Sequence, residues 1–226
     1  MGTGLQTAPA PAVGAVAGAA AMPDAEALEL ARRWCGEFLA RPHPLIGRAG
    51  QVCPFVESVT RAGTLLVRTR RTTADESADD AALDRVVAEM ERTFRTAAWA
   101  HRNRTLRALL VVLPDLPQAH WERLDRLQSR VKAELAERGL MLGQFHPACP
   151  EAAVRNPEFL VSRSPVPMLA LRTMAFHDIL FLDSDRRLFS AYAREFGRRF
   201  AGTSGIDPVF RSRYEAARKR FADPTE

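Results

Sequence analysis

The chain has 226 residues, of which 46% are hydrophobic and 26% charged, and its formal net charge is +5. This length and composition predict a globular protein with room for one sizeable core. Lys132 and Lys219 are the only lysines among the 32 basic residues, and the others are all arginine. The arginines are spread among many acids over several predicted helices rather than gathered beside aromatic residues, so nucleic acid is not an expected partner.

The three cysteines, Cys35, Cys53 and Cys149, are an odd number and form no CxxC pair. This argues against a disulfide framework and a zinc ribbon, and it indicates a reducing, cytoplasmic location. No apolar run approaches the roughly 18 residues of a membrane span, so no membrane association is expected. Residues 1–22 are rich in Ala, Gly and Pro, which predicts a disordered tail before a single domain over residues 23–226.

Hydrophobic periodicity predicts that helices and strands alternate along this domain. The first helix begins at Pro23–Asp24 and ends before the prolines of residues 41–44. Strands are predicted over residues 64–70, 106–113, 140–145 and 167–172; a helix begins within residues 74–81, another lies within residues 114–139, and two arginine-rich helices cover about residues 186–200 and 208–221. The apolar run 106–113 is typical of a central strand that is covered on both faces. We therefore expect an α/β fold, with α+β as the alternative: a sandwich of helices packed on a mixed sheet of about four strands.

Two loops beside the predicted strand ends contain an unusual number of polar residues. The first loop follows the first helix and carries Arg48 and Cys53. The second connects the last two strands and carries His146, Asn156, Arg163 and Ser164. Because α/β proteins usually place their sites in loops at strand ends, we expect positions 53 and 146 to line one cavity, with position 163 beside it.

His146 is the leading candidate for a metal or haem ligand, or for a general base, because neutral imidazole ligates metals and titrates near physiological pH. The alternative is a structural histidine that bonds a loop carbonyl. The guanidinium groups of Arg48 and Arg163 suit a carboxylate, a phosphate or the haem propionates. Asn156 and Ser164 are further candidates for binding the cofactor.

Cys53 has two interpretations. A free cysteine is commonly a small buried hydrophobe, but a nearby cation such as Arg48 would favour a reactive thiolate. Cys35 lies on the apolar face of the first helix and is expected in the core. Cys149 lies in a stretch that looks exposed and is the least persuasive candidate of the three.

The segments VCPF, FHP and RSPVPMLALR together resemble a family of uncharacterised bacterial proteins that carry a domain of unknown function. The resemblance spans about Trp34 to Leu182. It implies shared residues at Cys53, Pro54, Phe55, His146, Pro147, Asn156, Arg163, Ser164, Pro165 and Pro167. The loop around Cys53 is also faintly similar to the YqcI/YcgG proteins, some of which are haem-dependent N-oxygenases of amino acids and guanidines.

These observations lead to three functional hypotheses. The first is a haem- or iron-dependent oxidoreductase of specialised metabolism, acting on an amino-acid-like or carboxylate-bearing small molecule, with His146 as ligand. The second is a cofactor-free enzyme that uses Cys53 or His146. The third is a non-catalytic binding or partner protein that docks through its basic C-terminal helices.

Overall fold

The computed structural model describes residues 22–202 and 205–222, and it contains a four-stranded mixed sheet with helices around it. The strands are β1 (Leu65–Thr69), β2 (Ala108–Val112), β3 (Leu140–Phe145) and β4 (Met168–Thr173). The helices are α1 (Asp24–Trp34), α2 (Val56–Arg61), α3 (Ala74–Ala78), α4 (Asp80–Thr96), α5 (Glu122–Glu137), α6 (Ile179–Leu182), α7 (Arg186–Phe196) and α8 (Pro208–Phe221). The predicted α/β class is confirmed. Apart from Met22, the predicted tail lies outside the described residues, and the division into a tail and one domain stays a prediction.

The strand order is β1-β2-β4-β3, in which β1 and β2 are parallel while β4 is antiparallel to both of its neighbours. Three strands therefore run in one direction and β4 runs in the other. We call the edge where β1, β2 and β3 finish the carboxyl end of the sheet. The edge where they start, and where β4 finishes at Thr173, is the amino end.

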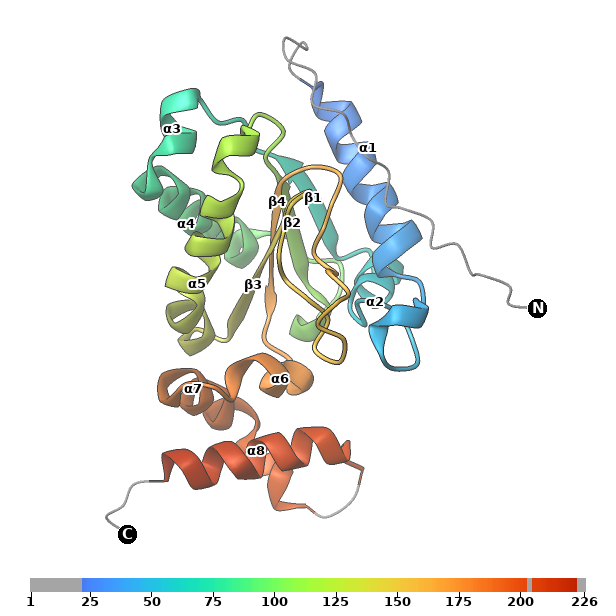
Figure 1. Cartoon of the computed structure of the whole chain (residues 1–226), viewed down its shortest axis with the longest axis vertical. Coiled ribbons are helices and arrows are strands. Elements are labelled where there is room, and N and C mark those ends of the chain that lie inside the picture. The colour runs from blue at the N-terminus through green and yellow to red at the C-terminus, as the bar shows by residue number, and fades with distance from the viewer. Residues whose placement is uncertain (1–21, 203–204, 223–226) are drawn as a thin grey trace, which may run out of the picture.

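Helices cover both faces of the sheet (Figure 1). Helices α1 and α2 lie on one face, α4 and α5 lie on the other, and α6 to α8 lie beyond the amino end (Figure 1). Because side chains alternate along a strand, Leu109 and Val111 of β2 enter the core on the α4 and α5 face. Leu110 and Val112 enter the core on the α1 face, so the prediction of a central strand covered on both sides is confirmed.

The second predicted helix is divided in two at Asp79. Asp79 has extended backbone angles and its carboxylate accepts hydrogen bonds from the amides of Ala81 and Ala82, so it caps α4 and ends α3. An acid-rich run predicts a helix start, but it does not reveal which acid takes the capping position. Helices α2 and α6 were not predicted, since each is too short to show helical periodicity.

Candidate functional site

The two positions that were expected to line one cavity, Cys53 and His146, lie apart in the structure. Phe55 lies at the amino end, where its ring stands 3.9 Å from the guanidinium of Arg172, close to the last residue of β4. His146 follows Phe145, which pairs with Met168 at the first residue of β4. The six residues of β4 span about 17 Å. Cys53, two residues before Phe55, and His146 therefore lie at opposite ends of the sheet, and the prediction of a common cavity is wrong.

At the carboxyl end, His146 belongs to a buried polar cluster with Asp125 of α5. The Nε2 atom of His146 lies 3.1 Å from Oδ2 of Asp125. The amide of Gln144 donates to Oδ1 of Asp125 at 3.2 Å, and the thiol of Cys149 donates to the same oxygen at 3.6 Å. Residues 144 and 146 project to the same side because side chains alternate along an extended chain. The turn after His146 is closed by a hydrogen bond from the Cys149 amide to the His146 carbonyl, and it brings Cys149 back beside them.

Burial makes this cluster unusual. His146 is 2% exposed, Cys149 is fully buried, and the carboxylate-bearing side chain of Asp125 is 23% exposed. The sequence indicated that Cys149 lies in an exposed stretch. The structure instead shows it buried. If Nε2 of His146 donates to Asp125, its Nδ1 atom carries a lone pair, and this buried atom has no hydrogen-bond partner in the described structure. A buried polar atom without a hydrogen-bond partner is uncommon in folded proteins and calls for an explanation, such as a bound water or ion.

The donor set also has the spacing of a metal site. One ligand atom from each of Asp125, His146 and Cys149 lies within 4.8 Å of the others. Tetrahedral zinc with bonds of about 2.0 to 2.3 Å separates its ligand atoms by roughly 3.3 to 3.8 Å. The 3.1 Å from Nε2 of His146 to Oδ2 and the 3.6 Å from the Cys149 sulfur to Oδ1 are near this range, although they run to different oxygens of Asp125. Three protein ligands with one further position open are typical of catalytic zinc.

The thiol of this cluster is not a free nucleophile. Burial, together with a smaller effect of the Asp125 carboxylate, raises the pKa of Cys149 to about 12 against the lowering effect of the Glu151 backbone amide. Burial likewise raises the pKa of Cys35 to about 12. Cys35 lies in the core beside α1, as predicted. A thiol with such a pKa loses its proton near neutral pH when a cation binds the sulfur.

Ser164 joins the carboxyl-end cluster through its backbone, and Arg163 stands next to it. The Ser164 amide donates to the His146 carbonyl at 3.4 Å, and the Ser164 hydroxyl donates to the Val166 carbonyl at 2.6 Å. Ser164 therefore fixes the path of the chain beside His146, and its hydroxyl does not face a ligand. The Arg163 side chain is exposed and forms no hydrogen bond or ion pair with any described residue. Its guanidinium is free to meet an anion.

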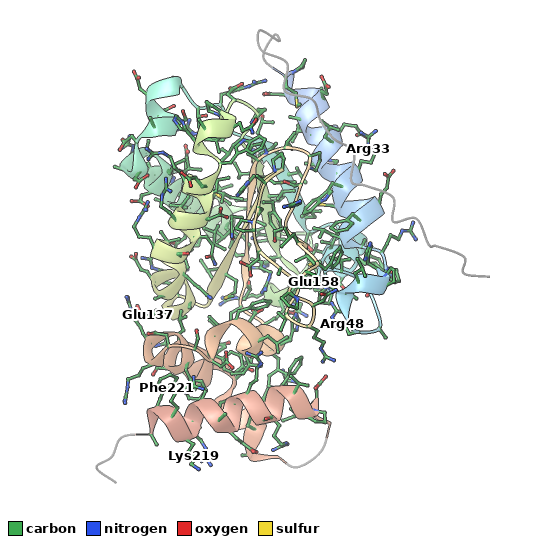
Figure 2. The ribbon with its side chains drawn as sticks, viewed as in Figure 1. Arg33, Arg48, Glu137, Glu158, Lys219 and Phe221 are labelled. Atoms are coloured by element: carbon green, nitrogen blue, oxygen red, sulfur yellow. The ribbon has the colours of Figure 1, made fainter. Side chains whose placement is uncertain are left out.

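The remaining predicted site residues lie at the amino end. Arg48 donates to the carbonyls of Ala49 and Val52, and Asn156 donates to the carbonyl of Leu45. Cys53 packs on the core beside α1. The two loops do meet here, as Figure 2 shows for Arg48 and Glu158 beside α2. Their contacts join the loops to each other and do not surround His146.

Phe55 organises this second region. Its ring stacks on His177 with centroids 4.5 Å apart, while Arg172 covers it and forms a two-bond ion pair with the fully buried Asp178. His177 stacks in turn on Phe210 of α8 at 6.4 Å. These contacts connect the loop after α1 to the C-terminal helices. The role of Phe55 is therefore to pack these two parts of the chain together.

The described cavities lie away from both regions. One, of about 410 Å³, is lined by α7 and the end of α5 and includes Glu137 and Arg194. The other, of about 170 Å³, lies between β1 and α4 and includes Arg70 and Met90. Neither is lined by His146, Cys53 or Arg163. Neither depression is therefore part of the two polar regions described above.

A family model described as "Domain of unknown function (DUF6875)" matches residues 28–206. The chain belongs to this family. The DUF6875 match begins within α1 and ends before α8, so it includes the sheet and both polar regions described above. No curated protein and no solved structure is similar enough to the chain to count as a match. Among the described residues, no helix has both the length and the apolar character needed to cross a lipid bilayer.

Sequence reasoning missed Asp125 and undervalued Cys149. Asp125 stands among Arg123, Arg126 and Glu122 on an amphipathic helix, where a solvated charge is the ordinary interpretation. A signal was nevertheless present for the separation of Cys53 from His146. Cys53 precedes a strand and His146 follows one, and in parallel strands these positions fall at opposite edges.

Proposed function

We propose that this DUF6875 protein is a metal-dependent enzyme that acts on a small anionic molecule at the carboxyl end of its sheet. The observation that carries the proposal is the buried cluster of Asp125, His146 and Cys149, whose ligand atoms lie within 4.8 Å of one another. It combines an oxygen, a nitrogen and a sulfur ligand from two segments of the chain. Open α/β sheets commonly bind their ligands beyond the carboxyl ends of their strands.

Zinc and iron(II) are the ions that suit this mixed donor set, because thiolate and imidazole select them over magnesium or calcium. The ion would bind the Nε2 atom of His146, the sulfur of Cys149 and the carboxylate of Asp125. The fourth position would open on the Asp125 side, since this is the one ligand with solvent exposure. A bound zinc ion would polarise a carbonyl or activate water. Iron would support the oxidoreductase chemistry that the sequence predicts.

A small ion suits His146 better than haem does. One nitrogen of this imidazole is held by Asp125, and the other is buried within packed side chains near Trp121, whose ring centroid lies 6.0 Å away. An axial haem ligand must present a nitrogen to an open, flat apolar cleft. The iron part of the haem hypothesis therefore remains in the proposal, with the protein itself supplying the ligands.

Arg163 would bind the anionic group of the substrate. Its guanidinium is exposed and unpaired with any described residue, and the neighbouring Ser164 is fixed to His146 by a backbone hydrogen bond. This arrangement holds the base of the arginine beside the proposed ion. The free cysteines of the described chain support a reducing, cytoplasmic location as part of the same proposal.

Cobalt(II) substitution tests the proposal, because thiolate-to-cobalt charge transfer gives a visible and near-ultraviolet band that reports a sulfur ligand directly. We expect the band in the unaltered protein and in the control variants Cys35→Ser and Cys53→Ser. It should be lost in Cys149→Ser, and the cobalt affinity should fall in His146→Gln and Asp125→Asn. Metal analysis of the protein as isolated then identifies the natural ion. A cobalt spectrum without a thiolate band in folded protein contradicts the proposed centre.

A further inference from the structure

Lys132 is the one described lysine that is partly buried. It lies on α5, whereas the only other lysine, Lys219, is exposed on the outer side of α8 (Figure 2). No described residue gives the Lys132 amine a hydrogen bond or an ion pair. Burial lowers the pKa of Lys132 even though the negative charges of Glu151 and Asp183 act to raise it. Burying a charged amine that has no partner costs free energy of folding, and lysines placed in this way are often functional.

Its position on the helix relates it to the proposed metal centre. Seven residues separate Lys132 from Asp125, and at about 100° per residue they turn the helix by about 700°, only some 20° short of two full turns. Both side chains therefore lie on one stripe of α5, about 10 Å apart along its axis. Gln128, between them, donates to the Leu142 carbonyl at 3.4 Å, so this stripe faces the outer edge of β3.

The connection after β3 faces the same stripe along its first residues. His146 and Cys149 contact Asp125. The acids whose negative charges act on Lys132 are Glu151, two residues after Cys149, and Asp183, which follows α6. The seam between α5 and this connection thus begins at the proposed ion and ends at an ammonium group. A molecule lying in the seam would meet a metal at one end and a positive charge at the other.

We infer that Lys132 binds the second anionic group of the substrate, which makes that substrate a dicarboxylate or an amino acid with an acidic side chain. The inference rests on the proposed function, in which the ion and Arg163 would bind the first anionic group. Lys132 is thus a specificity-determining residue, and it sets the distance between the two groups of the substrate. A substrate with a single anionic group would leave the amine without a partner.

The experiment uses the full-length, cobalt-loaded protein with linear dicarboxylates from succinate to suberate, and with monocarboxylates of equal length. Binding is measured by calorimetry, and the cobalt spectrum is recorded for each sample. We expect dicarboxylates to bind, with an optimum chain length, and to bind about tenfold more weakly to Lys132→Met, which is the usual effect of losing one charge-assisted bond. Lys219→Met should bind them as the unaltered protein does, and Lys132→Arg should retain most of the affinity.

The chain also offers a readout that does not depend on activity. Besides the N-terminal amine, an amine-acylating reagent has only Lys132 and Lys219 to modify, and mass spectrometry assigns each product. A bound dicarboxylate should slow the modification of Lys132 but not of Lys219. Equal dicarboxylate affinity in Lys132→Met and unaltered protein, or no dicarboxylate binding at all, would overturn the inference even where the thiolate–cobalt band is intact. Absence of that band in unaltered protein instead marks a failure of the metal centre itself.

Discussion

The imidazole of His146 lies 3.1 Å from the carboxylate of Asp125, although 21 residues and a strand separate them in the chain. This pair joins the helix before β3 to the loop after it. Asp125 also accepts from Gln144 and Cys149, so one carboxylate contacts a side chain near the end of β3 and two side chains of the loop after it. The pair should therefore matter for stability as well as for metal binding.

Replacing Asp125 by alanine should lower the free energy of unfolding by about 3 kcal/mol, because it removes the partner of the buried His146 and Gln144 side chains, while the Cys149 thiol keeps only the Gln144 carbonyl at 3.8 Å. Urea unfolding measures this. The matched control on the same helix is Glu122→Ala, whose ion pair with Arg126 is exposed and should be worth less than about 0.5 kcal/mol. If the two substitutions lower the free energy of unfolding equally, Asp125 does not form the buried hydrogen bonds described above.

Asp178 should be among the most costly charges to remove. Its side chain is fully buried and accepts two bonds from Arg172, at 2.6 and 2.7 Å, and a third from the Ala175 amide. Asp178→Ala leaves the Arg172 cation half-buried and unpaired, and we expect a loss of about 3 to 5 kcal/mol in the free energy of unfolding. Arg61→Ala removes the exposed pair with Glu57 and is the control, with an expected change below about 1 kcal/mol.

His177 should make stability sensitive to mild acid. Burial lowers the pKa of this histidine below its usual value of about 6.5, and the cations Arg172 and Arg48 lower it further against the raising effect of Asp178. The unfolded chain then takes up this proton before the folded protein does. Stability is therefore full above about pH 6.5 and declines as the pH falls toward the folded-state pKa, by at most about 1.4 kcal/mol per pH unit.

The comparison that isolates this effect is between His177→Gln and His101→Gln, measured by urea unfolding from pH 7.5 to 5. The His177 variant should show a flatter profile than unaltered protein, and the variant of the exposed His101 should follow the unaltered profile. If both variants lose stability with falling pH as steeply as the unaltered protein, a titrating group other than His177 causes the pH dependence.

Gly47 and Gly63 provide a test of how closely the two polar loops are packed. Both have positive φ, 74° and 64°, so alanine is strained at either position by about 1 to 2 kcal/mol. At Gly47 an added Cβ would also come within 2.9 Å of the Arg155 Cβ, whereas at Gly63 it would meet nothing within 4 Å. Gly47→Ala should therefore cost more than Gly63→Ala in the free energy of unfolding. Similar losses would mean that the two loops move apart easily.

Much of the fold could be predicted from the sequence because each strand is a compact apolar run, and β3 has the predicted bounds, residues 140–145. His146 as a candidate ligand followed from its place at a strand end. Its partners could not be predicted, because Asp125 is one of many charges on α5 and only the packing of that helix along β3 selects it. Cys53 was placed in the same site because loop composition does not indicate at which end of a sheet a loop lies.

The most direct test of the account is the absorption spectrum of the cobalt-loaded protein, recorded for the unaltered chain and for the three single cysteine-to-serine variants. We expect a thiolate–cobalt band that is lost only in Cys149→Ser and kept in Cys35→Ser and Cys53→Ser. A band that survives in Cys149→Ser, or that disappears instead with Cys53, would contradict the metal centre proposed at the carboxyl end of the sheet.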